Sequence, residues 1–375
     1  MGREDQSDRI VFARRLHWDL TPNTLSQRVA ARRASGERLI DLTNSNPTRA
    51  GFDFAPDLLA ALADPRSLTY EPTAQGLLAT RQAVAAYYAG HGAVVDPDDI
   101  FLTASTSEAY SYVFKLLADP GDEILVPQPS YPLFDFLAGM ESLKVHPYPA
   151  QAEDVTPWRV TQTRALVAVH PNNPTGDAAS RRLASSCAGQ GLPLIVDEVF
   201  LDYNWNERTQ LASFVSETAG TVFVLSGLSK VCGLPQMKLG WIVVAGRTPG
   251  VKERLELVAD TYLSASAPVQ WAAVQWLAGR HGIQEQIRRR CRENLAALDS
   301  SGLRRRAGVG GWTAVVELAE GLDEERLVLD LLEQDGVLVQ PGYFYDFPRG
   351  AAVVVSLLAL PEEFASAIGR LKART

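Results

Sequence analysis

Short apolar runs alternate with helix-like segments from about residue 98 onward. The strand-like runs, rich in β-branched residues and apolar at nearly every position, are DIFLTAS, DEILVPQ, RALVAV, GLPLIVD, TVFVLSG and LGWIVVAG. Such runs are typical of a mainly parallel sheet that helices cover on both faces. After the first run, TSEAYSYVFKLLAD has apolar residues at i, i+3, i+4 and i+7, which predicts an amphipathic helix. We expect Thr106 or Ser107 to cap it.

The pattern changes after about residue 270. A long helical stretch, VQWAAVQWLAGRHGIQEQIRRRCRENLAALDS, is followed by two apolar strands, GWTAVVELAE and AVVVSLLAL, with a helix near 323–334 between them and a helix at the end. This order is typical of an α+β layer. We therefore predict an α/β chain with two domains. The large domain, residues 51–269, has a mainly parallel central sheet flanked by helices, and residues 1–50 and 270–375 form the smaller α+β domain.

Polar residues follow the apolar cores of several predicted strands. Ser105, Gln128, Asn173, Asp197 and Lys230 each stand at a carboxyl end. In an open α/β sheet these ends converge on the ligand crevice, so we expect Lys230 to share a site with Asn173 and Asp197. Each residue alone also has a structural interpretation: Asp197 as a cap, Asn173 as a turn residue and Lys230 as a surface lysine.

Composition narrows the class of protein. The chain has 375 residues, of which 46% are hydrophobic, and its longest apolar run, AAVVVSLLAL, is half the roughly 20 residues that a membrane span needs. Its 3 cysteines are too few and too widely spaced for a disulfide framework. We expect a globular cytoplasmic protein that does not bind membranes.

Charge and spacing disfavour two other kinds of site. The net charge of −8 repels nucleic acid, and the basic clusters IRRRCR and LRRR fit solvated faces. The 5 histidines lack cysteine or carboxylate partners at ligand spacing, so no metal site is expected. The glycine-rich GVGG at 308–311 follows no predicted strand and opens no helix, so it is not a dinucleotide fingerprint.

Three motifs in fixed order carry a resemblance to a known family. DEVF begins at Asp197, 24 residues after Asn173 of NPTG, and SGLSK places Lys230 33 residues beyond Asp197. With YEPTAQGLLATRQAVAAYY, DPGDEILVPQPSYP, SAPVQ and VLVQPG, this order resembles the class I/II aminotransferases, which have PLP-transferase fold type I. The resemblance covers most of the chain. It implies a pyridoxal 5'-phosphate (PLP) enzyme that moves an amino group from an amino acid to a 2-oxo acid.

The resemblance also implies roles for single residues. Lys230 matches the lysine that forms a Schiff base with the cofactor and then moves a proton. Asp197 matches the aspartate that keeps the ring nitrogen protonated, and Asn173 the asparagine that donates to the phenolic oxygen. Tyr131 matches the aromatic residue that stacks on the ring.

The cofactor phosphate needs hydrogen-bond donors and positive charge. The expected donors are the helix start at 105–107 and two hydroxyls near Lys230: Ser105, Thr106, Ser107, Ser226 and Ser229. Lys238 stands where the family usually has an arginine, so it offers a point charge rather than a planar fork. Tyr70 matches a tyrosine that reaches the phosphate of the neighbouring subunit, which implies a homodimer.

The sequence departs from the family at two positions. Phe200 replaces the tyrosine of D-x-x-Y, which removes one hydrogen bond to the phenolic oxygen. Val354 replaces the arginine of R-x-S, which clamps the carboxylate of the substrate. An unpaired buried carboxylate would be costly, so another cation must serve. Arg49 in LTNSNPTRAG is our candidate and Arg349 the second choice, although both also fit a surface role.

The missing arginine leaves two other functions open. A PLP-dependent lyase or biosynthetic enzyme would keep the cofactor but break another bond, for example in β-elimination. A non-catalytic PLP-binding regulatory module is the third alternative, although no helix-turn-helix segment precedes RLIDLTNSNP.

Overall fold

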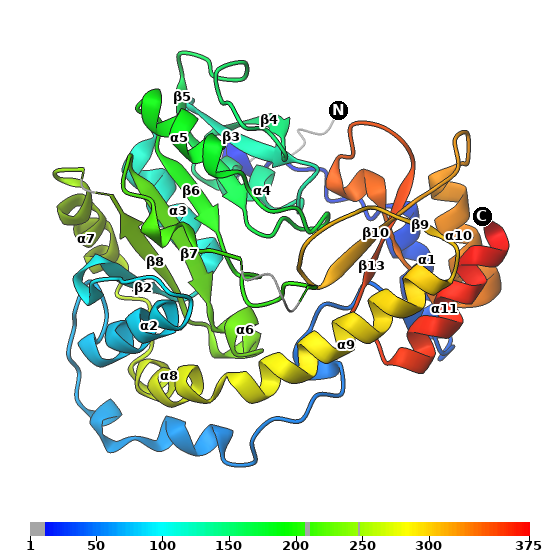
Figure 1. Ribbon diagram of the computed structural model, residues 1–375, viewed down its shortest axis with the longest axis horizontal. Helices are drawn as coiled ribbons and strands as arrows, with labels where there is room; N and C mark the ends of the chain where they lie inside the picture. The colour runs from blue at the N-terminus through cyan, green and yellow to red at the C-terminus, as the bar shows by residue number, and fades with distance from the viewer. Residues whose placement is uncertain (1–11, 207–210, 247) are drawn as a thin grey trace, which may run out of the picture.

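A seven-stranded sheet forms the centre of the larger part of the molecule (Figure 1). The computed structural model describes residues 12–206, 211–246 and 248–375. In spatial order the strands are β2 (Ile100–Thr103), β8 (Gly240–Ala245), β7 (Val222–Gly227), β6 (Leu194–Asp197), β5 (Thr163–Val169), β3 (Glu123–Gln128) and β4 (Lys144–Pro149).

The sheet is mainly parallel, as the sequence predicted. Strand β8, the LGWIVVAG run, is antiparallel to both of its neighbours, β7 and β2. The connection from β7 to β8 holds only short helical turns, among them α6 (Leu228–Val231), and lacks a helix that could carry the chain back across the sheet. The chain therefore re-enters the sheet from the edge at which β7 ends.

Helices cover both faces of this sheet. One face packs against α2 (Leu78–Gly90), α5 (Arg181–Gly189) and α8 (Ala267–Gly279), and the other against α3 (Thr106–Leu117), α4 (Phe134–Met140) and α7 (Val251–Tyr262). Successive residues of β8 alternate between the two cores: Trp241 lies in the first and Ile242 in the second. Burial on both faces explains why the strands are apolar at nearly every position.

The cap of α3 differs from the prediction. Ser105, rather than Thr106 or Ser107, is the N-cap: its backbone is extended and its hydroxyl accepts the N–H of Glu108 at 3.2 Å. The side chain of an N-cap can reach the free N–H groups only from outside the helix. Thr106 and Ser107 are already helical and cannot serve in this way.

A smaller layer is built around a second, antiparallel sheet. Its strands, in spatial order, are β12 (Gln340–Pro341), β13 (Ala352–Ser356), β10 (Thr313–Glu317) and β9 (Arg304–Arg305), and β1 (Ile40–Asp41) pairs separately with β11 (Val337–Leu338). The helices of this part are α1 (Thr24–Ala34), α9 (His281–Ser300), α10 (Glu324–Asp335) and α11 (Pro361–Arg374). The predicted helices near 323–334 and at the end of the chain are both present.

The long helix predicted after residue 270 is two helices, α8 and α9, which meet at Arg280. The buried side chains of α8 belong to the core of the large sheet, whereas those of α9 belong to the core of the small sheet. Figure 1 shows α9 running from beneath the large sheet to the small one. The domain boundary at residue 270 stays a prediction, and the packing changes partner about ten residues later, at Arg280.

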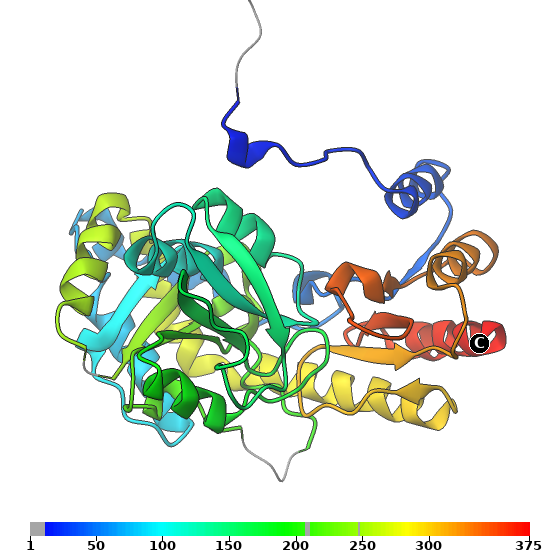
Figure 2. The same cartoon turned by 90° about the horizontal axis from the view of Figure 1, so that it is seen from above.

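The N-terminal segment runs along the outside of the molecule from the large-sheet part to the small one (Figure 2) and contacts each through side chains. Trp18 packs edge-on against Phe136 of α4, with ring centroids 5.0 Å apart. Farther along, Arg28 of α1 pairs with Glu333 of α10 at 3.3 Å. Within the described residues, no helix combines the length and the apolar character needed to cross a membrane.

Candidate active site

Strands β5, β6 and β7 are neighbours in the sheet and end at the same edge. Asn173 follows β5, Asp197 is the last residue of β6, and Lys230 lies in α6 directly after β7. The topology thus brings an amide, a carboxylate and an amine to one edge of the sheet. The charges of Asp197 and Lys230 each shift the pKa of the other, so the two side chains are electrostatically coupled.

Asp197 is held by two donors. The N–H of Val199 donates to Oδ1 at 3.0 Å, and the hydroxyl of Tyr110 donates to Oδ2 at 3.1 Å. Burial raises the pKa of Asp197 to about 6, while these hydrogen bonds and the charge of Lys230 act in the opposite direction. The carboxylate is therefore fixed in orientation and costly to keep charged unless a cation lies against it.

Lys230 has a fixed backbone and a free amine. The hydroxyl of Tyr203 donates to the Lys230 carbonyl at 2.6 Å, and the amide of Gln284 in α9 donates to the Val231 carbonyl at 2.9 Å. The Nζ atom makes no hydrogen bond or ion pair with any residue that the structure describes. Burial lowers the pKa of Lys230 to about 8, opposed by the charge of Asp197. Burial thus favours the neutral, nucleophilic form of the amine.

Asn173 connects the two parts of the molecule. The hydroxyl of Thr313, the first residue of β10, lies 3.1 Å from the Pro174 carbonyl and 3.4 Å from Oδ1 of Asn173. The small sheet therefore contributes directly to the edge of the site.

The first turn of α3 lies beside the Lys230 turn because two glycines allow close backbone contact. Gly227 at the end of β7 pairs with Gly240 at the start of β8. A Cβ on Gly240 would lie 2.8 Å from the carbonyl carbon of Ser105 and 3.0 Å from the nitrogen of Thr106. Residues 105–107 are only partly buried. The dipole of α3 makes its first turn favourable for an anion, and the phosphate roles of Ser105, Thr106 and Ser107 stay predictions.

The other predicted phosphate donors are placed less uniformly. Ser229 is partly exposed and Lys238 is exposed. Ser226 is fully buried, and its hydroxyl has no hydrogen-bond partner in the described part of the chain. It pairs with Trp241, so it lies on the face of β7 opposite to Leu225, the partner of Asp197. The phosphate roles of these three residues stay predictions.

The predicted stacking residue, Tyr131, lies just beyond β3 and is 47% exposed. The neighbouring Ser130 N–H donates to the carbonyl of Tyr345, which comes from the small-sheet part, at 3.1 Å. The tyrosine is thus presented where the two parts meet.

Val354, at the position of the family's arginine, is fully buried. It packs with Val315, Ala352 and Tyr345 in a small apolar cluster, whereas Val353 and Val355 face the main core on the other side of β13. No cation takes the place of the arginine among these cluster residues.

Arg49 is exposed, and its guanidinium has no hydrogen bond or ion pair to a described residue, although its backbone N–H donates to the Asn46 carbonyl at 3.1 Å. It ends the short 3-10 helix Pro47–Arg49. The segment before this helix is anchored to the end of β13, because the Ser356 hydroxyl donates to the Asn44 carbonyl at 2.7 Å. Arg349 is also exposed.

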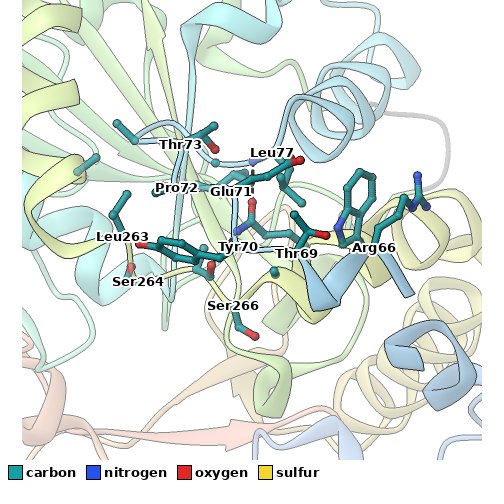
Figure 3. A pocket seen from close by; sticks show the side chains of 18 of the residues that line it. Arg66, Thr69, Tyr70, Glu71, Pro72, Thr73, Leu77, Leu263, Ser264 and Ser266 are labelled. Carbon is teal, nitrogen blue, oxygen red and sulfur yellow. Dashed lines mark hydrogen bonds between the residues drawn. The ribbon is translucent and has the colours of Figure 1, made fainter. Parts of the chain in front are cut away.

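Tyr70 lines a pocket of about 440 Å³ together with residues of the segments 66–77 and 263–271 (Figure 3). The ring is next to Leu263 and Ser264 in this view and is 80% exposed. Nearby, the guanidinium of Arg66 lies 3.8 Å from the centre of the Trp271 ring. The pocket therefore contains an exposed aromatic side chain.

Sequence reasoning missed several residues around Lys230. Tyr110 was interpreted only as an apolar position of a helix, and no local signal marks the Tyr203 hydroxyl. Trp312 was not singled out either, and the centre of its ring lies 4.8 Å from Nζ of Lys230. Phe200, which the sequence analysis did single out, has its ring centre 5.7 Å from the same atom. Among the described residues, no group of three or more histidine, cysteine or acidic side chains is placed to hold a metal ion.

Comparison with known proteins decides the family. A model for aminotransferase class I and II matches residues 37–355. The chain belongs to this family. It is thus an enzyme that transfers amino groups, as the resemblance implied.

Relatives of this aminotransferase include the alanine aminotransferase of Mycobacterium tuberculosis, 28% identical over 92% of this chain and 87% of that protein. The glutamate-pyruvate aminotransferase of Escherichia coli is 28% identical over 84% of each chain. None of the relatives named here is a lyase or a regulator, so the comparisons favour transamination.

Solved structures confirm the fold of the aminotransferase. An aminotransferase from Escherichia coli superposes with a TM-score of 0.84 at 22% identity, covering 98% of both chains. The alanine aminotransferase of Pyrococcus furiosus gives 0.82 at 22% identity, covering 93% of this chain and 95% of that one. The predicted fold type I, with its mainly parallel sheet and smaller second layer, is therefore correct.

Proposed function

We propose that this aminotransferase uses PLP attached to Lys230 to move an amino group from an amino acid to a 2-oxo acid. The observation that carries the proposal is a free, desolvated amine coupled to the partly buried Asp197 at the strand edge beside the N-terminus of α3. The donor set fits the group: Lys230 suits the aldehyde, Asp197 the ring nitrogen, Asn173 the phenolic oxygen, and the first turn of α3 the phosphate.

Bound PLP would supply an electron sink that stabilises negative charge at the substrate's α-carbon. The residues of the chain would do the rest. Lys230 would hold the cofactor and, once released, carry the α-proton on Nζ. Asp197 would keep a proton on the ring nitrogen through its negative charge, which in turn offsets the cost of its burial.

The relatives suggest the class of substrate. Those described above are named for alanine, or for glutamate and pyruvate. We infer that this chain also acts on a small α-amino acid with a 2-oxo acid as acceptor.

The colour of the bound cofactor tests the reaction class: its yellow should disappear with one amino donor and return with a 2-oxo acid. Release of ammonia without a second substrate would instead indicate a lyase.

Replacing Arg49 by alanine is expected to raise KM for the amino acid roughly 10- to 100-fold, since a charged hydrogen bond to the carboxylate is worth about 1.5–3 kcal/mol. The expectation follows from the buried valine at 354 and from the free guanidinium of Arg49. Steady-state kinetics of Arg49→Ala measures it, and the same measurement on Arg349→Ala tests the second candidate. If KM stays at the wild-type value while the cofactor remains bound, Arg49 is not the clamp.

Replacing Phe200 by tyrosine is expected to lower the pKa read from the visible absorbance of the bound cofactor by roughly one unit, because the new hydroxyl would stabilise the phenolate. Phe200 is buried, and its ring centre lies 5.7 Å from Nζ of Lys230, so a hydroxyl on this ring would be added close to the site. A pH titration of both proteins measures the change, and thermal melting checks the fold of the variant. A pKa equal to or above that of wild type would contradict the role assigned to this position.

We also propose that the active form is a homodimer in which Tyr70 reaches the phosphate of the neighbouring subunit. The support is an 80% exposed tyrosine lying across an open pocket. The described cysteines are all free and buried, which supports the proposal of a reducing, cytoplasmic compartment.

A further inference from the structure

The glycine-rich loop at 308–311 packs backbone to backbone between two loops at the edge of the site. The N–H of Val309 donates to the Gly176 carbonyl at 2.8 Å, and the N–H of Gly311 donates to the Tyr203 carbonyl at 2.8 Å. A Cβ on Gly308 would lie 2.4 Å from the Thr175 carbonyl oxygen, and one on Gly310 would lie 2.7 Å from the Tyr203 carbonyl oxygen. Only glycine allows this approach, so the loop is a packing device rather than a nucleotide site.

The loop delivers the next residue, Trp312, to the amine of Lys230. The indole is fully buried, and its ring centre is 4.8 Å from Nζ. It is fixed by edge-on contacts with Phe200 at 5.4 Å and with Tyr203 at 4.9 Å. Its carbonyl accepts the N–H of Leu357, in the segment after β13, at 2.8 Å. The ring is therefore held by both parts of the molecule.

The position of this ring matters because Nζ has no hydrogen-bond acceptor among the described residues. A cation within about 6 Å of an aromatic ring centre is attracted by the negative face of the ring, most strongly where water is absent. Trp312 and Phe200 both lie within that range of Nζ. Asp197, at the end of β6, is the charged group whose field acts on Lys230. The rings and the carboxylate thus favour the ammonium form, against the loss of water.

We propose that Trp312, presented by the glycine-rich loop, is a positioning residue that forms an aromatic seat for the free amine of Lys230. The inference rests on the proposed function, since Nζ is free only while Lys230 does not hold the cofactor. A ring attracts an ammonium group without fixing its direction as a carboxylate would. The seat therefore keeps a proton-carrying Nζ close to the site and leaves it able to move.

The test is the titration of Lys230 in the full-length chain after removal of cofactor. Acetylation with acetic anhydride over a range of pH, with the Lys230 peptide quantified by mass spectrometry, gives the apparent pKa of the amine. In Trp312→Leu we expect this pKa to fall by about one unit, because the ring no longer stabilises the ammonium form. In Trp312→Phe it should fall by less, since a smaller ring remains. The indole N–H has no partner in the described part of the chain, so neither variant loses a hydrogen bond there.

Trp158→Phe is the matched control, because this indole packs on Tyr148 and should leave the titration unchanged. Should Trp312→Leu fail to fold, Trp312→Phe still gives a downward shift or none. An unchanged apparent pKa of Lys230 in the folded variants, or a higher pKa because water enters the space, would overturn the proposed role of Trp312. Borohydride reduction of the wild type with PLP separates the two ideas: no cofactor fixed at Lys230 refutes the proposed function, whereas fixed cofactor with an unmoved titration refutes only the seat.

Discussion

Replacing Lys230 by alanine should lower kcat/KM for transamination by roughly 10⁴-fold or more, because one change removes both the attachment point of the cofactor and the proton carrier. The structure supports so large an effect, since Lys230 is the one lysine of α6, the turn that follows β7, and its pKa responds to the charge of Asp197. Steady-state kinetics with the donor that bleaches the wild type measures the loss. Partial rescue by added methylamine would show that an amine was the missing group.

Lys252→Ala is the control for this experiment. Lys252 pairs with Asp99 at 2.6 Å on the surface of the large domain, so its loss should leave kcat/KM within a few-fold of the wild type. A Lys230→Ala protein that kept its yellow colour and more than a tenth of its activity would contradict the assignment of Lys230.

Replacing Asp197 by asparagine should lower kcat by roughly 10²–10³-fold, because the amide keeps the shape but loses the charge that would hold a proton on the ring nitrogen. Removing this charge should also lower the pKa of Lys230 below about 8, since the field of Asp197 opposes the effect of burial. Kinetics and the acetylation titration measure the two effects separately.

The same variant should change the pH dependence of stability. Burial raises the pKa of Asp197 to about 6 from its ordinary value near 4, so the cofactor-free wild type loses stability as pH rises through that interval. Asparagine does not titrate, and the variant should lack this loss in urea unfolding between pH 4 and pH 7. Equal pH profiles for the two proteins would show that the carboxylate is not strained by burial.

Glu198→Gln provides a close comparison. Glu198 follows Asp197 directly and is fully buried, and burial raises its pKa to about 7. It accepts hydrogen bonds from Ser213 and Phe214 instead of facing Lys230. A small effect of Glu198→Gln on kcat beside a large effect of Asp197→Asn would tie the loss to the site rather than to burial of charge. Equal losses in both variants would contradict the role of Asp197.

Local sequence pattern sufficed for the parts of the fold that local physics determines. Continuous apolar runs indicate strands that are buried on both faces, so the sheet was predictable. Polar residues directly after these runs indicate the carboxyl edge, so the grouping of Asn173, Asp197 and Lys230 was predictable too. The direction of β8 and the break at Arg280 were not, because each depends on which distant segment the chain packs against. Trp312 was missed for the same reason. The glycines before it allow close packing against the loops at residues 176 and 203, and the sequence does not show that these loops are its neighbours.

Helix α9 connects the turn that carries Lys230 with the small-sheet part of the molecule. Near its start, α9 donates to the Val231 carbonyl through Gln284, and near its end Asn294 donates to the Leu357 carbonyl at 2.9 Å. The two side chains are about 15 Å apart along a rigid rod. Any tilt of the small-sheet part over an arriving substrate would therefore be transmitted through α9 to the turn that carries Lys230. Closure of the site would then also shift the reactive amine.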